Sequence, residues 1–328
     1  MNTVNSQVVP VPPSVTRSLL AGFDTIANHL GLILFSIGLD ALLWFGPQLR
    51  LTRLFASYLD WSLAQAGAQT PQMTEFVTAN REALLETVAR FNLLGMLRSL
   101  PLGIPSLMAG RMPAGNPLSM LGGIELQSFG GVLLISLGLI VFGLAVGALY
   151  FHLVSQAAIS GKVAWGRTLH DWPKAAGQVF LLALFLLAAL AAISLPLSCV
   201  LPFLMISGGS LGKLLLFMYA GMMIWLLFPV IYSPFGIFLH QDKMWASLLR
   251  GIRLARMTLP YSVLFALAGL VLSQGLDMLW AIPKDTSWLA VVGVIGHAFI
   301  SSGIIAAAFV FYRDAEQFLQ QKQQIIPA

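Results

Sequence analysis

The chain has 328 residues, of which 58% are hydrophobic and only 9% are charged, and its formal net charge is +5. Its mean hydropathy is +0.83. A soluble domain carries roughly 25% charged residues, so this composition excludes a water-soluble globule and a disordered chain. It also excludes a nucleic-acid-binding domain, and the single cysteine excludes a secreted disulfide scaffold. A polytopic membrane protein remains.

Long uncharged runs provide the predicted membrane spans. A bilayer requires about 20 apolar residues per helix. The runs are uniformly apolar rather than alternating, which indicates helices and not barrel strands. We therefore predict an all-α fold, in which a single membrane domain of residues 1–328 forms a polytopic six-helix transmembrane bundle. The predicted spans are residues 27–45, 130–153, 179–203, 215–237, 261–281 and 288–311.

The positive residues of the short loops predict the orientation. Those on one side are Arg17, Lys162, Arg167, Lys174, Lys243, Arg250, Arg253, Arg256, Arg313 and Lys322. The short loops on the other side hold only Lys213 and Lys284. By the positive-inside rule both termini are cytoplasmic, and we expect a multi-pass protein of the inner (plasma) membrane. Residues 1–14 contain no positive side chain, so we expect a retained first span rather than a cleavable signal.

Residues 48–128 form a long external segment between spans one and two. Apolar residues at three- and four-residue steps predict one amphipathic helix from Leu51 to Leu63 and a second that begins at Thr70 and Pro71. A proline- and glycine-rich connection follows. These helices form either a cap packed on the bundle or a layer on the outer leaflet. The cap is the favoured interpretation, because neither helix has a dominant basic face.

Three cytoplasmic stretches, residues 14–26, 159–175 and 241–258, precede spans one, three and five and are predicted to be interfacial helices. They suggest three repeated units, although any six-span protein needs such connections. In the third stretch the basic residues are candidates for contacts with anionic lipid headgroups on the cytoplasmic side. The alternative is that they only enforce the orientation. These candidates are Lys243, Arg250, Arg253 and Arg256.

One stretch carries a family resemblance. Pro229 and Pro234 mark the end of span four, an amphipathic segment runs from Trp245 to Arg256, and another span follows. This arrangement resembles the six-span membrane domain found with some bacterial glycerophosphodiester phosphodiesterases, and related stand-alone integral membrane proteins of unknown function. The resemblance implies an architecture rather than a reaction, because no soluble stretch can hold a catalytic barrel of roughly 250 residues.

The sequence contains none of the common catalytic or phosphate-binding motifs, so we predict no enzyme, no cofactor and no metal. His29 and His152 lie near the cytoplasmic ends of their spans and are the residue type that a b-type haem needs. We interpret them instead as interfacial polar residues. Membrane lipids are the expected partners, together with an unidentified membrane protein, and no nucleic acid.

Ionisable residues inside the spans form the candidate site. Asp40 and Asp277 are predicted to lie at similar depth in the outer half of the membrane, with His297 roughly 6 Å deeper. All three are expected to face the bundle interior, because an ionised side chain that faces lipid is costly. Ser273 and Gln274 lie one turn from Asp277. These residues predict a polar layer shared by spans one, five and six, which either binds a proton or solute or pins the helices together.

Two functions follow from this pattern. The leading expectation is a non-enzymatic accessory or scaffold component of the inner membrane, because no convergent catalytic set is visible. The alternative is a small-solute or lipid transporter whose polar site lies between spans one, five and six.

Overall fold

The computed structural model describes residues 11–66, 71–99, 101–118, 123–206 and 210–325. It is about 82% helical, which confirms the predicted helical class. Among the described residues, five helices are long and apolar enough to cross a membrane, and a sixth span results if the bent pair at residues 15–28 and 30–45 counts as one. The helices therefore fit a multi-pass membrane protein.

The chain divides into two compact units. Unit 1 comprises Met1–His29, Ala148–Val271 and Gly303–Ala328, and unit 2 comprises Leu30–Gly147 and Leu272–Ser302. Three long helices contribute to both units, and each unit is described by itself. These helices are α6 (Phe129–Ser160), α11 (Leu259–Trp280) and α12 (Ala290–Ile325).

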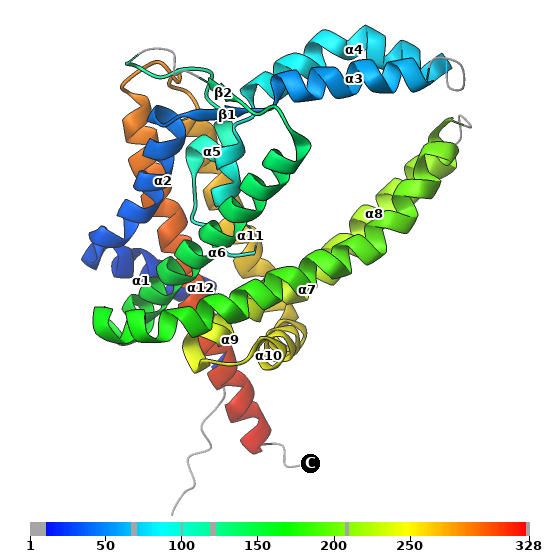
Figure 1. The fold of residues 1–328 in the computed structure, drawn as a ribbon. Helices are drawn as coiled ribbons and strands as arrows, with labels where there is room; N and C mark the ends of the chain where they lie inside the picture. The colour runs from blue at the N-terminus through cyan, green and yellow to red at the C-terminus, as the bar shows by residue number, and fades with distance from the viewer. Residues whose placement is uncertain (1–10, 67–70, 100, 119–122, 207–209, 326–328) are drawn as a thin grey trace, which may run out of the picture. The chain divides into compact units, whose positions relative to one another are not determined.

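The elements that lie wholly in unit 1 are α1 (Val15–Asn28), α7 (Trp165–Ile206), α8 (Ser210–Leu227), η3 (Phe228–Tyr232), α9 (Ser233–His240) and α10 (Met244–Met257). Ser14 is the N-cap of helix α1, and its hydroxyl accepts a hydrogen bond from the amide of Arg17. Helices α7 and α8 run back along each other as a hairpin (Figure 1), and the hydroxyls of Ser194 and Tyr219 are 2.6 Å apart between them.

Aromatic side chains of α9 and α12 form the core of unit 1. The ring of Phe235 lies 4.7 Å from that of Phe309, and Phe265 of α11 stacks on Phe311 at 4.6 Å. The backbone of α10 approaches η3 and α9 closely, because a Cβ on Gly251 would lie 2.6 Å from the amide nitrogen of Ser233. This contact fixes the amphipathic helix α10 against the helices that precede it.

Two boundaries in unit 1 differ from the sequence prediction. The predicted interfacial helix 159–175 and span 179–203 are wrong as separate elements, because α7 is one continuous helix of 42 residues. The helix runs through both Pro173 and Gly177 without a break. The predicted span 215–237 is present but interrupted, since Pro229 and Pro234 place η3 between α8 and α9.

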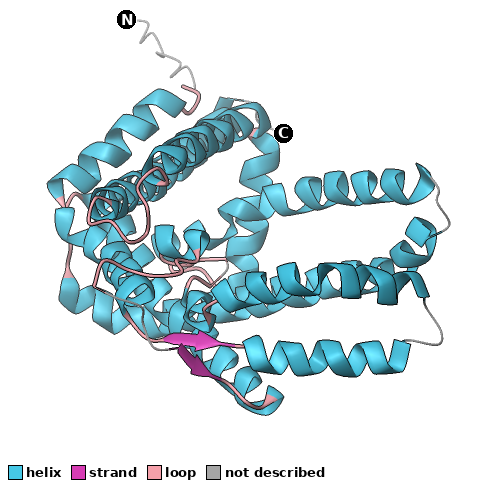
Figure 2. Ribbon diagram, turned by 90° about the horizontal axis from the view of Figure 1, so that it is seen from above, coloured by secondary structure: helices cyan, strands magenta, loops and turns pink. Residues whose placement is uncertain are grey.

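The elements that lie wholly in unit 2 are η1 (Leu30–Ile33), α2 (Leu34–Phe45), β1 (Gln48–Arg50), α3 (Thr52–Ala66), α4 (Pro71–Arg90), η2 (Leu93–Leu97), α5 (Leu107–Arg111) and β2 (Gly123–Glu125). Strands β1 and β2 pair in parallel (Figure 2). Strand β1 follows α2 and strand β2 precedes α6, so the pairing joins the beginning and the end of the segment that connects these two helices. We call residues 46–128 the α2–α6 segment.

The two predicted amphipathic helices of the α2–α6 segment are confirmed as α3 and α4. They pack on each other as a hairpin, and Arg81 of α4 forms an ion pair of 2.9 Å with Asp60 of α3. Tyr58 and Trp61 of α3 are 47% and 59% exposed. Beyond its own contacts, the hairpin contacts β1, the side chain of Glu125 and the ring of Phe129 at the start of α6. The choice between a bundle cap and a leaflet layer stays a prediction.

The predicted first span, residues 27–45, is wrong as a single continuous helix. Helical hydrogen bonding ends at Asn28, His29 leaves the helical region with φ −132° and ψ 52°, and η1 precedes α2. At 1.5 Å per residue the 12 residues of α2 extend about 18 Å, which is less than the roughly 30 Å of a bilayer core.

Candidate functional site

Part of the α2–α6 segment lies against α6 rather than beyond its end. At a rise of 1.5 Å per residue from Phe129, Gly143 and Gly147 lie about 21 and 27 Å along α6. A Cβ on Gly143 would lie 2.4 Å from the carbonyl oxygen of Leu97, and one on Gly147 would lie 2.1 Å from that of Leu102. The glycines therefore permit non-helical backbone to lie directly on α6.

We call residues 93–111 the inserted stretch. Six of its apolar side chains are less than 9% exposed, namely Leu93, Leu97, Leu102, Ile104, Leu107 and Met108. Since α6 is apolar enough to span a membrane, these two contacts place irregular backbone beside the interior of a candidate span rather than at its end. Irregular backbone is tolerated there only where protein or a water-filled cavity surrounds it, so its polar groups need partners.

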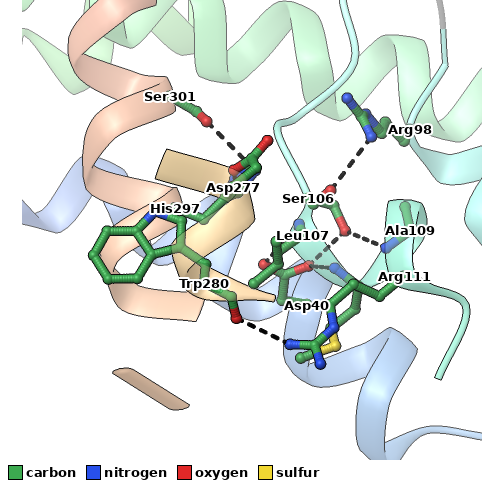
Figure 3. A network of polar contacts seen from close by, with 11 residues as sticks. Asp40, Arg98, Ser106, Leu107, Ala109, Arg111, Asp277, Trp280, His297 and Ser301 are labelled. Carbon is green, nitrogen blue, oxygen red and sulfur yellow. Dashed lines mark hydrogen bonds and ion pairs between the residues drawn. The ribbon is translucent and has the colours of Figure 1, made fainter. Parts of the chain in front are cut away.

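Asp40 of α2 supplies such a partner. Its side chain is fully buried and accepts three hydrogen bonds. The hydroxyl of Ser106 and the amide of Met108 donate to Oδ1 at 2.5 and 2.9 Å, and the amide of Leu107 donates to Oδ2 at 3.2 Å (Figure 3). The Ser106 hydroxyl in turn accepts from the amide of Ala109 at 3.0 Å and begins α5.

The arrangement around Asp40 is that of a structural clamp. A carboxylate offers about four acceptor positions, and protein donors fill three of them. Burial of an unpartnered carboxylate would be costly, whereas these charge-assisted bonds offset that cost and fix the inserted stretch to α2. The geometry leaves Asp40 little capacity to bind a solute.

Asp277 and His297 form the second polar cluster of unit 2. Asp277 lies one turn before the end of α11 and is 28% exposed, while His297 of α12 is 6% exposed. The Nδ1 atom of His297 lies 2.7 Å from Oδ1 of Asp277, and Nε2 lies 3.4 Å from the hydroxyl of Ser301 (Figure 3). The carboxylate therefore orients the imidazole and leaves Nε2 directed toward Ser301.

Trp280 positions this pair. A Cβ on Gly296 would lie 2.6 Å from its indole ring, and one on Gly293 would lie 3.0 Å from its carbonyl oxygen. The two glycines therefore let α11 and α12 approach until Asp277, one turn before Trp280, reaches His297. His297 also lies close enough to Asp40 for the two groups to interact electrostatically.

Arg111, at the end of the inserted stretch, was not predicted as a site residue. Its guanidinium donates to the carbonyl oxygens of Trp280 at 3.1 Å and Pro283 at 2.6 Å, and it forms an ion pair of 2.6 Å with Asp285. The side chain is 14% exposed. Its signal in the sequence is an isolated arginine in an apolar, proline-rich connection. Arg111 thereby ties α5 to the connection between α11 and α12.

The structure brings some of the predicted residues together. Asp277 and His297 are in direct contact, whereas the hydrogen bonds of Asp40 go to residues 106–108 of the inserted stretch. Ser273 is half-buried on α11 and Gln274 is exposed. The contact of Ser301 with His297 follows the spacing seen in the sequence. A functional role for these residues stays a prediction.

The four candidate lipid contacts are exposed at or beside α10. Arg250, however, forms ion pairs with Asp242 at 3.0 Å and Glu316 at 3.4 Å. Lys243, Arg253 and Arg256 have no carboxylate within ion-pair distance in the described chain. Leu248 is buried against the protein, while Trp245 and Leu249 are 56% and 64% exposed.

The two histidines weighed for haem lie in unit 1. The ring of His29 contacts the carbonyl oxygen of Thr25, one turn earlier on its own helix, at 3.0 Å. His152 is 4% exposed, and neither ring nitrogen has a hydrogen-bond partner in the part of the chain that is described. Among the same residues no group of three His, Cys, Asp or Glu side chains is arranged to hold a metal ion.

No protein-family model, curated protein or solved structure matches this chain. The resemblance to the six-span membrane domain therefore stays a prediction, and the function is argued from the geometry alone.

Proposed function

We propose that the protein is a membrane transporter of a small solute or lipid, and that the Asp277–His297–Ser301 cluster binds the proton or solute that moves. The contact of 2.7 Å between Asp277 and His297 carries this proposal. Ionisable pairs inside apolar helices are expensive, and they mark ion pathways and proton relays in membrane proteins. The partly exposed carboxylate gives the buried imidazole a connection to the surface of unit 2.

Two further features support transport. Helical structure is interrupted before α2 and again between α8 and α9, and the inserted stretch places irregular backbone along α6. Interrupted helices and irregular backbone at membrane depth are typical of transporter sites. Asp40 serves this site as a positioning residue, because it holds the inserted stretch, whose Arg111 in turn contacts the end of α11.

The experiment is electrical. Proteoliposomes adsorbed to a solid-supported membrane are perfused with a panel of amino acids, sugars, organic acids and lysolipids, with and without a pH gradient. The native protein is expected to give a current with at least one solute class, and His297→Gln and Asp277→Asn are expected to abolish it. Lys284→Gln in the neighbouring loop is the matched control and retains the current.

The outcome also separates transport from packing. If no member of the panel produces a current, or if both variants carry the native current, the transport proposal is wrong. Size-exclusion profiles and thermal unfolding in detergent are measured for each variant. A variant that loses current while it keeps its native unfolding midpoint assigns the cluster to the site rather than to helix packing.

A specific observation favours a second function, that of a non-enzymatic accessory or scaffold component. Two candidate spans bury few of their residues inside the protein. In their most apolar parts, 11% of the residues of the α7 span and 6% of those of the α8–α9 span are buried. Leu187 and Phe217 are 66% and 78% exposed. A photo-crosslinker at these positions is expected to join one discrete membrane protein if the hairpin is a docking surface. Labelling of lipid alone contradicts that role.

We also propose that the protein lies in the inner membrane, that both termini are cytoplasmic and that anionic lipids are its partners. In a Cys199→Ala background, a membrane-impermeant maleimide is expected to label Lys284→Cys in intact cells. Lys322→Cys is expected to react only after the membrane is opened. The reverse pattern contradicts the orientation that the loop charges predict.

A further inference from the structure

A cavity of about 270 Å³ lies in unit 2 where α4, η2 and α5 meet. Its wall combines two arginines, Arg90 and Arg98, with the amide of Asn92 and with methionine side chains. No residue of this wall is an aspartate or a glutamate. The cavity is separate from the Asp277–His297–Ser301 cluster, and nothing in the transport proposal assigns it a role.

Arg98 provides the uncompensated charge. Arg90 forms an exposed ion pair of 2.6 Å with Glu86, so its charge has a partner. Arg98 has no carboxylate within ion-pair distance in the described chain, and it makes one long hydrogen bond of 3.4 Å to the carbonyl oxygen of Ser106. A guanidinium held in a cavity wall without an acid attracts a carboxylate or phosphate group.

Asn92 provides a second donor. Its side-chain oxygen accepts hydrogen bonds from the amides of Leu49 and Leu94, both at 3.1 Å, which fixes the orientation of the side chain. Its Nδ2 atom is buried and has no hydrogen-bond partner among the described residues. A buried donor without a partner is costly, and an acceptor from a ligand in this cavity would remove that cost.

The rest of the wall is apolar and adaptable. Met96, Met108 and Met112 line the cavity, and the unbranched methionine side chain fits irregular apolar ligands. The volume lies just below the range of about 300–1,000 Å³ that drug-sized ligands occupy. The cavity therefore has room for an acidic headgroup and for only the first part of a hydrocarbon chain.

We infer that this cavity binds an anionic amphiphile, with its acidic headgroup on Arg98 and Asn92 and the start of its acyl chain against the three methionines. The headgroup chemistry is a phosphate or a carboxylate, and the source is a membrane lipid or a free fatty acid. The inference does not rest on the transport proposal, because none of the residues it uses belongs to the Asp277–His297–Ser301 cluster.

The test measures ligands retained by the full chain. The protein is reconstituted in phosphatidylcholine nanodiscs that contain phosphatidylglycerol, and bound lipid is counted by native mass spectrometry after release. Separate arms use oleate and inorganic phosphate in place of phosphatidylglycerol. Arg98→Gln is expected to weaken retention about tenfold, as the loss of one charge-assisted hydrogen bond predicts. Arg53→Gln, on α3 and outside the cavity, is the control and retains native binding.

Gly95→Phe tests the cavity itself. A Cβ on Gly95 meets no atom within 4 Å, so the ring enters open space and is expected to abolish retention while the protein still folds. Preference for phosphatidylglycerol identifies a lipid, and preference for oleate identifies a fatty acid. Native retention in both Arg98→Gln and Gly95→Phe overturns the inference, as does inorganic phosphate that binds as tightly as either amphiphile.

Discussion

The imidazole of His297 and the carboxylate of Asp277 lie 2.7 Å apart, although 20 residues separate them along the chain. They meet because α11 and α12 approach closely at Trp280, against which Gly293 and Gly296 lie. The same approach places Ser301 beside the second imidazole nitrogen. A chain of three polar groups thus lies between two helices that are long and apolar enough to cross a membrane.

Asp40→Asn is predicted to destabilise the protein. The variant replaces a charged acceptor with a neutral amide, and one of its two polar atoms becomes a donor that faces the amide or hydroxyl donors of Ser106, Leu107 and Met108. The expected loss is on the order of 3 kcal/mol, since hydrogen bonds to charged groups contribute about 1.5–3 kcal/mol each. Thermal unfolding in detergent measures it. Asp24→Asn, at an exposed position of α1, is the control, and equal midpoints for both variants contradict the clamp.

Gly147→Ala is predicted to displace the inserted stretch from α6. A Cβ there would lie 2.1 Å from the carbonyl oxygen of Leu102, whereas a Cβ on Gly138 of the same helix meets nothing within 4 Å. Forcing extra volume into a packed contact costs about 1–3 kcal/mol. Limited proteolysis should therefore cut residues 93–111 faster in Gly147→Ala than in Gly138→Ala. Identical cleavage rates would falsify the close packing of this segment.

Arg111→Lys is predicted to be nearly as damaging as Arg111→Met. A lysine can replace the charge opposite Asp285, but it lacks the planar fork that serves the carbonyl oxygens of Trp280 and Pro283 at the same time. The expected loss is about 2–3 kcal/mol for this largely buried group. Arg90→Gln, which removes an exposed ion pair, should cost no more than about 1 kcal/mol. Full stability of Arg111→Lys shows that charge alone is sufficient.

Arg253 and Arg256 are predicted to recruit anionic lipid, in contrast to Arg250. The ion pairs of Arg250 with Asp242 and Glu316 already use its charge within the protein. Arg253→Gln with Arg256→Gln should reduce the enrichment of anionic lipid around the protein, at about 1 kcal/mol per residue. Arg250→Gln should lower stability and leave the enrichment unchanged. If Arg250→Gln reduces the enrichment of anionic lipid while the double variant leaves it unchanged, this interpretation of α10 is wrong.

Composition and periodicity were sufficient to predict much of the fold. Uniform apolar runs placed α6, α11 and α12, the predicted interfacial stretch 14–26 corresponds to α1, and the pair Thr70–Pro71 marked the start of α4. These features depend on neighbours in the sequence. The contact of His297 with Asp277 was predicted in part, because both residues were placed in one polar layer of the halves of α11 and α12 nearest the turn that joins these helices.

The features that sequence analysis missed depend on contacts between distant segments. No sequence pattern singles out Gly143 and Gly147, and only the fold shows the backbone of Leu97 and Leu102 against them. The partners of Asp40 and Arg111 lie 66 to 174 residues away along the chain, so no local pattern identifies them. The continuity of α7 was missed because the change from the charged stretch 159–175 to the uncharged run after it suggested two elements, whereas the helix continues through both.

The most direct test of the Asp277–His297 pair is nitrogen-15 NMR of histidine in the reconstituted protein, with the His297 signals assigned by their loss in His297→Gln. In the neutral ring, Nδ1 is expected to carry the proton and donate it to Asp277, which leaves Nε2 as the acceptor nitrogen. In Asp277→Asn this fixed tautomer should disappear. A His297 ring that carries its proton on Nε2, or that keeps the same tautomer in Asp277→Asn, contradicts an ordered Asp277–His297 pair.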